Sequence, residues 1–361
     1  MSHKIHTSFQ PLEESIMDFT ILGMGKTGHA AACYLMEQGH KVTVWDRNPD
    51  KIAALQENGI SIYGQIVGEF RPDACQDIGE AVGESRYLLV FTTAIGHRPI
   101  AEALKGKLQQ GQRILIFNGN WGAVEFAECL GNELEEKEII LGETGAQIFA
   151  ASLKTTGQSY LKSLKKAVDF STYPASCAET VSTELLSVFP QLHPVGNVLE
   201  TSLNMSNPIA HCPLDLFNLA AIDAGQEKLM FASEYTSPRG VAYTEQVDRE
   251  RLALLEKIGV KGQSLLQLFN KSWQSDYTDL FTAFKKIKSY QTAKSPTDFA
   301  SRHFTEDIPF GILPIQKLAQ RHGVETPYID AMLDLYRLVL GEEFSRGEPD
   351  LTEVDLKKYM G

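Results

Sequence analysis

Three glycines at positions 23, 25 and 28 have the G-x-G-x-x-G spacing with which a chain holds the pyrophosphate of a dinucleotide. Gly23 allows a tight turn, Gly25 lets the backbone approach the pyrophosphate, and Gly28 lets a helix pack closely on a strand. A helix that begins here points its unpaired N–H groups at the phosphates. Lys26 and Thr27 lie inside this loop, so we expect both to contact the cofactor.

An acidic residue, Asp46, ends the second apolar run, where a carboxylate accepts hydrogen bonds from a ribose diol. The same negative charge repels a 2′-phosphate, so Asp46 favours NAD as the cofactor. Arg47 and Lys51 follow closely and offer positive charge to a 2′-phosphate. NADP is therefore the alternative cofactor.

A polar cluster at residues 204–211 contains residue types suited to proton transfer. It ends in His211, whose imidazole has a usual pKa that suits general acid–base catalysis. Asn207 precedes it by four residues, so either a helix places both on one face or Asn207 caps a helix that starts at Pro208. A purely structural, hydrogen-bonded histidine is the other interpretation.

A second polar cluster at residues 302–311 combines a guanidinium, carboxylates and a closing Pro-aromatic-Gly turn. Arg302 precedes Asp307 by five residues. Two interpretations are open: Arg302 holds a substrate carboxylate with its planar fork, or it forms a salt bridge within a surface loop.

Strand and helix signals alternate over the first half of the chain, which predicts a parallel, doubly wound sheet. Strands are expected at 19–22, 42–46, 60–63, 87–91, 113–117 and 138–141, and helices at 29–38, 51–58 and 99–108. Ligands of such sheets bind beyond the carboxyl ends of the strands. We therefore expect one cleft lined by four loops, at 23–28, 92–97, 118–122 and 142–147. Thr93 in the second loop is expected to contact the cofactor.

From about residue 198 the pattern becomes helical, with helices expected at 199–225, 241–258, 263–269, 312–322 and 328–340. The fold class is therefore α/β plus all-α. We predict an N-terminal doubly wound Rossmann domain at 17–197, a helical C-terminal domain at 198–361, and a loose N-terminal extension at 1–16. A cleft between the domains would hold a small molecule beside the nicotinamide.

The composition is that of an acidic globular protein, with 43% hydrophobic residues and a formal net charge of −12. No stripe of lysine or arginine is evident, which argues against nucleic acid or an anionic membrane as a partner. No apolar run reaches the roughly 18 residues of a membrane span. The five cysteines have no C-x-x-C spacing, so we expect a cytoplasmic protein with reduced thiols and no metal site.

Over nearly its whole length from residue 17, the chain resembles the octopine/nopaline (opine) dehydrogenase family. The resemblance is carried by residues 92–104, 118–126, 143–144, 197–211, 248–251 and 302–311. It implies that His211 and Asp307 form the catalytic pair, and that Arg302, Asn207 and Met205 bind the substrate. Two loops that face the substrate, at 118–122 and 145–151, depart from the family's pattern and leave the substrate's identity open.

The resemblance also implies the reaction. Family members join the amino group of an amino acid to the ketone of a 2-oxo acid, such as pyruvate, and reduce the imine with NAD(P)H. His211 would transfer the proton, Asp307 would orient the imidazole of His211, and Arg302 would hold a substrate carboxylate. A homodimer is possible.

Two other functions compete with this one. A 2-oxo acid reductase of the ketopantoate reductase type needs no amine, but it usually uses a lysine acid, and no lysine stands in the motif here. A non-catalytic NAD(H)-sensing Rossmann protein would not need both His211 and Asp307.

Overall fold

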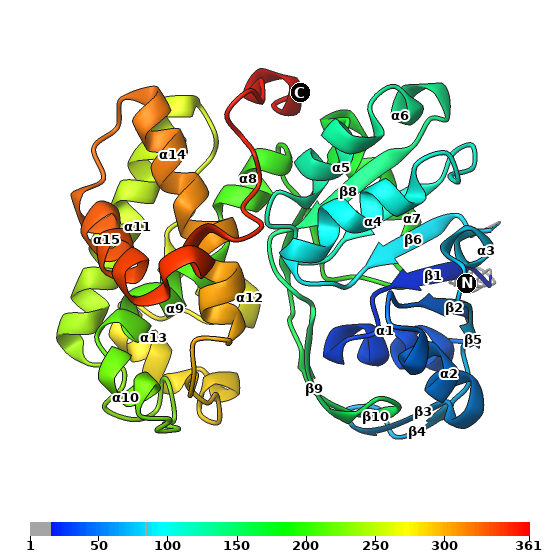
Figure 1. Cartoon of the computed structure of the whole chain (residues 1–361), viewed down its shortest axis with the longest axis horizontal. Helices are drawn as coiled ribbons and strands as arrows, with labels where there is room; N and C mark the ends of the chain where they lie inside the picture. The colour runs from blue at the N-terminus through cyan, green and yellow to red at the C-terminus, as the bar shows by residue number, and fades with distance from the viewer. Residues whose placement is uncertain (1–15, 84) are drawn as a thin grey trace, which may run out of the picture.

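A computed structural model describes residues 16–83 and 85–361 of the chain (Figure 1). An α/β domain and a helical domain lie side by side. All but the last residue of the loose extension predicted at 1–16 lies outside the described residues. None of the helices in the described ranges has the length and apolar character needed to span a bilayer.

An eight-stranded sheet forms the centre of the N-terminal domain, in the order β12-β11-β8-β7-β6-β1-β2-β5. Its strands are β1 (Asp18–Leu22), β2 (Lys41–Trp45), β5 (Asp73–Ala74), β6 (Tyr87–Val90), β7 (Arg113–Ile116), β8 (Ile140–Thr144), β11 (Val168–Tyr173) and β12 (Leu192–Pro194). From β1 the sheet extends to β2 on one side and to β6 on the other, so the switch point lies at the carboxyl ends of β1 and β6. The predicted parallel pairing holds for β1, β2, β6, β7 and β8, whereas β11, which was not predicted, runs antiparallel to β8.

Helices cover both faces of this sheet because its central strands are apolar on both faces. In β7, Ile114 and Ile116 pack in one core with α4 (His97–Leu104) and α5 (Gly122–Leu130). Leu115 and the following Phe117 pack in the other core, with α1 (Lys26–Glu37). The remaining helices of this domain are α2 (Pro49–Asn58), α3 (Ile78–Val82), α6 (Glu133–Glu136) and α7 (Ala178–Glu184).

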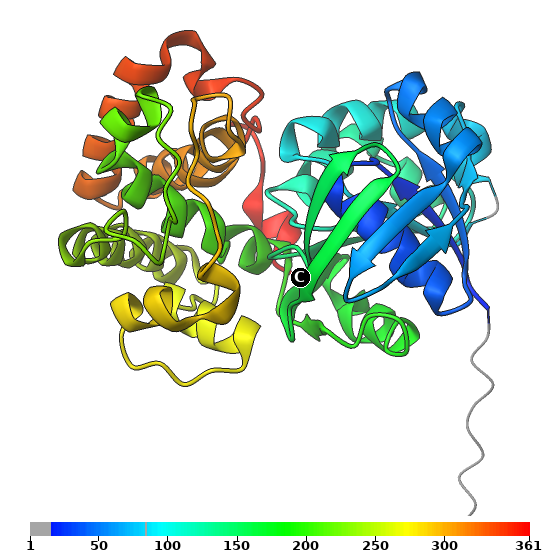
Figure 2. The same cartoon turned by 90° about the horizontal axis from the view of Figure 1, so that it is seen from below.

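A second, four-stranded sheet covers α1 on the side away from the main sheet (Figure 2). It contains β3 (Ile60–Gly64), β4 (Gly68–Phe70), β9 (Phe149–Thr155) and β10 (Gln158–Leu164). The strand predicted at 60–63 therefore exists, but it belongs to this small sheet. The segment 145–151, expected as a substrate-facing loop, leads into the β9–β10 hairpin. Four of its residues line the cleft at the switch point of the main sheet: Gln147, Phe149, Ala150 and Ala151.

The helical domain contains α8 (Val198–Leu203), α9 (Ser206–Leu216), α10 (Leu219–Asp223), α11 (Pro238–Ile258), α12 (Leu265–Trp273), α13 (Leu280–Lys286), α14 (Leu313–His322) and α15 (Pro327–Leu340). The single helix predicted at 199–225 is therefore three. Buried Arg251 explains the first break: its Nη1 donates to Leu203 O at 2.9 Å and to Asn204 Oδ1 at 2.8 Å. Arg251 lies on α11, so the carbonyl group of Leu203 at the end of α8 finds its hydrogen-bond donor outside its own helix, and α8 ends there.

The segment predicted as a loop at 302–311 is a π-helix over His303–Ile312 (η4). Such i→i+5 helices are rare and frequently occur at functional sites. This one packs against the start of α9, where a Cβ atom on Gly311 would lie 2.3 Å from Pro208 Cγ. Glycine at 311 therefore allows the two helices to approach closely.

The C-terminal residues after α15 return to the N-terminal domain, as the red end of the ribbon in Figure 1 shows. Glu128 on α5 accepts hydrogen bonds from Tyr359 and, at 3.1 Å, from Lys358. Asn197, which caps α8, donates to Met360 O at 3.5 Å. The two places where the chain passes between the domains therefore lie side by side.

Candidate active site

A cleft of about 680 Å³ lies at the switch point of the sheet and is shared by both domains. All four predicted loops contribute to its lining. The helical domain adds Asn207, Arg302 and Glu306. The carboxyl ends of the strands thus meet polar residues of the second domain in one space.

The glycine loop fits a dinucleotide pyrophosphate. Gly23 has a φ of 105°, which favours glycine, and a Cβ atom on Gly28 would lie 2.1 Å from Gly23 O. A Cβ atom on Gly25 would meet nothing within 4 Å, so that side of the loop is open. No side chain caps α1, so its first N–H groups are available to an anion. Lys26 and Thr27 line the cleft, whereas Gly28 lies behind it.

The carboxylate of Asp46 is held by three donors at the edge of the cleft. It accepts hydrogen bonds from Met24 N at 2.8 Å, Asn48 N at 2.9 Å and Lys51 Nζ at 3.0 Å. Asp46, Arg47 and Thr93 line the cleft, as a ribose-binding site requires. The ion pair with Lys51 offsets part of the charge with which Asp46 would repel a 2′-phosphate.

His211 and Asp307 are brought into direct contact by α9 and the π-helix. His211 Nδ1 lies 2.7 Å from Asp307 Oδ2, and Asp307 is buried. Burial lowers the pKa of His211 well below its usual range, with His303 and Arg302 adding to the effect. Burial also raises the pKa of the Asp307 carboxyl, which Arg302 opposes. Within the described part of the chain no residue forms a hydrogen bond with His211 Nε2, so the dyad leaves that nitrogen for a reacting group.

Arg302 lines the cleft and also approaches the dyad, whereas His211 and Asp307 themselves are not among the residues that line the cleft. Its Nη1 is 3.6 Å from Asp307 Oδ1 and 3.7 Å from Glu306 Oε2, distances longer than a hydrogen bond. The wide turn of the π-helix explains why Arg302 faces carboxylates both four and five residues ahead. Its guanidinium is thus close to anions without being bound tightly by them, which suits a residue that must also hold a substrate carboxylate.

The structure decides between the two arrangements left open at 204–211. Met205 is the N-cap of α9, so Asn207 lies within the first turn and shares a face with His211. The alternative in which Asn207 caps the helix is wrong. Asn207 lines the cleft, whereas Met205 is only 4% exposed and is not among the lining residues.

Three residues near this site are missed by sequence reasoning. Glu306 lines the cleft and accepts a hydrogen bond from Ala94 N at 2.9 Å, which joins the π-helix to the loop after β6. Lys165 directly follows β10; burial and, to a lesser extent, Arg302 lower its pKa to about 8, and its charge in turn lowers the pKa of His211. His303 stacks on His211. Glu306 could have been predicted, because it is an acidic residue directly beside Asp307 in the sequence. Lys165 carried no such signal, because the β9–β10 hairpin that it follows was not predicted.

The loop 118–122 is held in an unusual conformation. Asn118, Asn120 and Trp121 have φ values of 63°, 44° and 70°, a region that is unfavourable for tryptophan. Trp121 Nε1 donates to Phe310 O at 3.1 Å in the π-helix. Trp121, which has this unfavourable φ value, is thus also the residue through which the loop contacts the helical domain.

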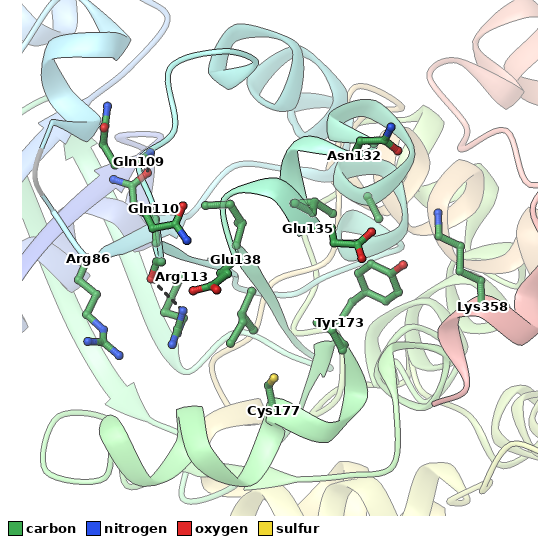
Figure 3. A pocket seen from close by; sticks show the side chains of 18 residues that line it. Arg86, Gln109, Gln110, Arg113, Asn132, Glu135, Glu138, Tyr173, Cys177 and Lys358 are labelled. Carbon is green, nitrogen blue, oxygen red and sulfur yellow. Dashed lines mark hydrogen bonds between the residues drawn. The ribbon is translucent and has the colours of Figure 1, made fainter.

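A second cavity, of about 900 Å³, lies at the other end of the main sheet's central strands (Figure 3). Two of its cations face one carboxylate: Arg86 Nη2 is 2.8 Å and Arg113 Nε is 3.8 Å from Glu184. None of the predicted site residues lines it. The cleft at the switch point is therefore the candidate active site.

Comparisons with known proteins agree with the two-domain arrangement. Residues 194–340 match the family model described as NAD/NADP octopine/nopaline dehydrogenase, alpha-helical domain, and residues 19–174 match that of ketopantoate reductase PanE/ApbA. The chain is 30% identical over 342 residues to an opine dehydrogenase of Arthrobacter sp. (strain 1C), which covers 94% of this chain and 95% of that protein.

Solved structures share the fold at low sequence identity. Octopine dehydrogenase with NADH and L-arginine has a TM-score of 0.73 at 16% identity, covering 90% of each chain. Yersinopine dehydrogenase with bound NADP⁺ has a TM-score of 0.72 at 14% identity, covering 92% of this chain and 94% of the other.

Proposed function

The chain belongs to the octopine/nopaline (opine) dehydrogenase family, and we propose that its interdomain cleft joins a 2-oxo acid to the amino group of an amino acid. The enzyme is an NAD(P)-dependent oxidoreductase of the kind that acts on CH–NH donors. The product is a secondary amine with two carboxylates. Pyruvate is the 2-oxo acid that we propose first.

The residues that line the cleft and the dyad beside Arg302 have separate roles in this reaction. When bound, the nicotinamide supplies the hydride that reduces the imine carbon. Arg302 holds a substrate carboxylate through its planar fork. His211 Nε2 takes a proton from the amino group of the substrate and gives it to the oxygen that leaves as water, and Asp307 holds the imidazole in one tautomer and stabilises the cation formed in between. Asn207, one turn before His211, binds a polar group of the substrate.

A product with two carboxylates calls for two cations. Arg302 is one, and we propose Lys165 as the second, because Arg302 lowers the pKa of Lys165 and Lys165 lowers the pKa of His211. A lysine with a lowered pKa also occurs as the proton donor in simple 2-oxo acid reductases. Lys165 would bind a carboxylate in the condensation reaction but would donate the proton in a simple 2-oxo acid reductase.

The observation that carries the proposal is the contact between the His211–Asp307 dyad and Arg302 beside the glycine loop's cleft. The test is NADH and NADPH oxidation with pyruvate alone, with pyruvate plus a pool of amino acids, and with neither. We expect turnover that requires the amine. Equal rates without amine would assign the protein to the reductases, and binding of NADH without any turnover would favour a sensor.

The compartment and the assembly are separate proposals. All five cysteines are free, which supports a reducing compartment, and we propose the cytoplasm. For a homodimer, exposed Leu335, Leu338 and Val339 on α15 offer an apolar surface. Light scattering of the purified protein tests the dimer, and a monomer would remove it.

A further inference from the structure

A fully buried histidine, His29, lies near the start of α1 and has no part in the roles assigned above. Its Nδ1 atom is 2.8 Å from Gly25 O. Its Nε2 atom accepts a hydrogen bond from Gly157 N at 3.1 Å, across 128 positions of the chain. The ring therefore ties the glycine loop to a distant part of the same domain.

The two partners fix the tautomer of the ring. A carbonyl oxygen only accepts, so Nδ1 of His29 carries the proton that it donates to Gly25 O. A backbone N–H only donates, so Nε2 keeps the lone pair that accepts from Gly157 N. Burial lowers the pKa of His29, which favours the same neutral form. Both bonds thus require one protonation state and one orientation of the ring.

The bond to Gly25 O acts on the peptide unit between Gly25 and Lys26. The carbonyl of Gly25 and the N–H of Lys26 belong to one planar trans unit and point in opposite directions. Gly25 O accepts from the backbone N–H of His29 at 3.1 Å and from its ring at 2.8 Å, so this carbonyl points into the helix. The N–H of Lys26 therefore points outward, where a helix N-terminus binds phosphate.

Glycine at position 25 makes this peptide easy to rotate. A Cβ atom on Gly25 would meet nothing within 4 Å, and without a Cβ its backbone dihedrals have little steric restraint. No side chain caps α1. Rotation of the peptide would leave the buried Nδ1–H of His29 without an acceptor, which costs free energy. The ring therefore restrains a backbone that is otherwise free to turn.

The bond to Gly157 fastens the start of α1 to the β9–β10 hairpin. Gly157 lies in the turn of this hairpin, and its carbonyl accepts from Ser61 N of β3 at 2.8 Å. Figure 1 shows α1 between the main sheet and the hairpin. Residues 149–151 of β9 line the cleft. His29 therefore joins the glycine loop to a second element of the cleft wall.

We propose that His29 is a positioning residue for the cofactor: its Nδ1–H holds the peptide between Gly25 and Lys26 with the Lys26 N–H turned to the pyrophosphate, and its Nε2 anchors this arrangement to the hairpin. The inference concerns the binding of NAD(P) and does not depend on which substrates the cleft joins. It requires that loss of the ring weakens binding of the pyrophosphate and leaves binding of the adenosine portion unchanged.

Fluorescence titrations with NADH test the inference on two variants. His29→Leu removes both bonds and should raise the Kd of NADH by about tenfold. His29→Asn should recover part of this loss, because an asparagine can donate to the carbonyl four residues earlier, as Asn58 Nδ2 does to Ala54 O at 3.2 Å. In competition with NADH, ADP should lose affinity to the same extent in His29→Leu. Adenosine, which has no phosphate, should keep its affinity.

Tyr34→Phe is the matched control on the same helix. It removes a hydroxyl that donates to Val188 O at 2.7 Å and that does not contact the glycine loop. Its Tm should fall while its Kd values for NADH and ADP stay unchanged. A folded His29→Leu protein that binds NADH and ADP at the original Kd would overturn the inference. An equal loss of affinity for ADP and adenosine would also contradict it, because that pattern indicates general damage to the domain.

NMR of the unmodified protein needs no variant. The N–H···N bond from Gly157 to His29 should give a scalar coupling between the two nitrogens, with the ring proton on Nδ1 at neutral pH. Addition of ADP should shift the amide signal of Lys26. A ring with its proton on Nε2, a missing coupling or an unshifted Lys26 amide would each reject the inference even if both variants fail to fold.

Discussion

His211 Nδ1 lies 2.7 Å from Asp307 Oδ2, although 96 positions separate the two residues in the chain. The contact exists only because the π-helix packs on the start of α9, where Gly311 meets Pro208. The wide turn of that helix also turns Arg302 toward Asp307. One irregular helix thus arranges both the proposed acid–base pair and the proposed substrate cation.

Removal of the imidazole should abolish most catalysis while leaving the fold and NADH binding nearly intact. We expect His211→Asn to lower kcat by roughly 10²–10⁴, the usual effect of losing a general acid–base group. Asp307→Asn should act in the same direction, and the double variant should be little worse than His211→Asn, because residues that act as a unit are not additive. Single-turnover kinetics measure all three, and multiplicative losses would show that the residues act separately.

Arg302 should act on substrate binding. Arg302→Ala is expected to raise the substrate KM by the equivalent of about 2–5 kcal/mol, since the pair with a carboxylate is made in the ground state and the transition state alike. Arg302→Lys should recover only part of this, because an ammonium cannot form a two-pronged contact. If Arg302 merely bridges Glu306 and Asp307, thermal melts of both variants will show a lower Tm while KM stays unchanged.

Asp46 should set the preference between cofactors. Asp46→Ser removes the ribose acceptor and the charge that repels a 2′-phosphate, so kcat/KM should fall with NADH and rise with NADPH. Arg47→Ala, at an exposed neighbouring position, is the matched variant and should weaken NADPH alone. A higher kcat/KM with NADPH in the unmodified enzyme would mean that Arg47 and Lys51 outweigh Asp46.

Glu125 should make stability depend on pH. Burial raises its pKa to about 7 from an ordinary value of 4.5, and its Oε2 atom has no hydrogen-bond partner among the described residues. The folded protein therefore keeps a proton that the unfolded chain releases, so the free energy of unfolding falls as pH rises from about 4.5 to 7, by up to about 3 kcal/mol. His97, 3.9 Å away, offers no compensating charge, because burial lowers its pKa to about 3.

Glu125→Gln should accordingly raise Tm at pH 8 relative to the unmodified protein and change it little at pH 5. Glu102→Gln on the exposed side of α4 is the control and should change neither value. An equal gain at both pH values would show that the Glu125 charge is not the cause.

Local pattern was sufficient for the central strands of the cofactor half. The apolar runs that became β1, β2, β6 and β7 are short and strongly patterned, and the glycine spacing fixes the turn after β1. The pairing of His211 with Asp307 came from a resemblance, because no local rule relates residues so far apart. The π-helix was interpreted as a loop since Pro309 and Gly311 normally end helices.

The elements that were missed depend on contacts distant in sequence. The β9–β10 hairpin completes a sheet with β3, and that pairing brings Lys165 within electrostatic reach of Arg302. The break after α8 depends on Arg251, 48 positions beyond Leu203. In both cases the local sequence gives no sign of the distant residues that determine its structure.

The neighbouring passages at Asn197 and Met360 have a mechanical consequence. The two domains are also joined across the cleft region by hydrogen bonds from Ala94 N to Glu306 and from Trp121 Nε1 to Phe310 O. A rotation of one domain about the neighbouring passages would therefore widen the cleft only by breaking these bonds.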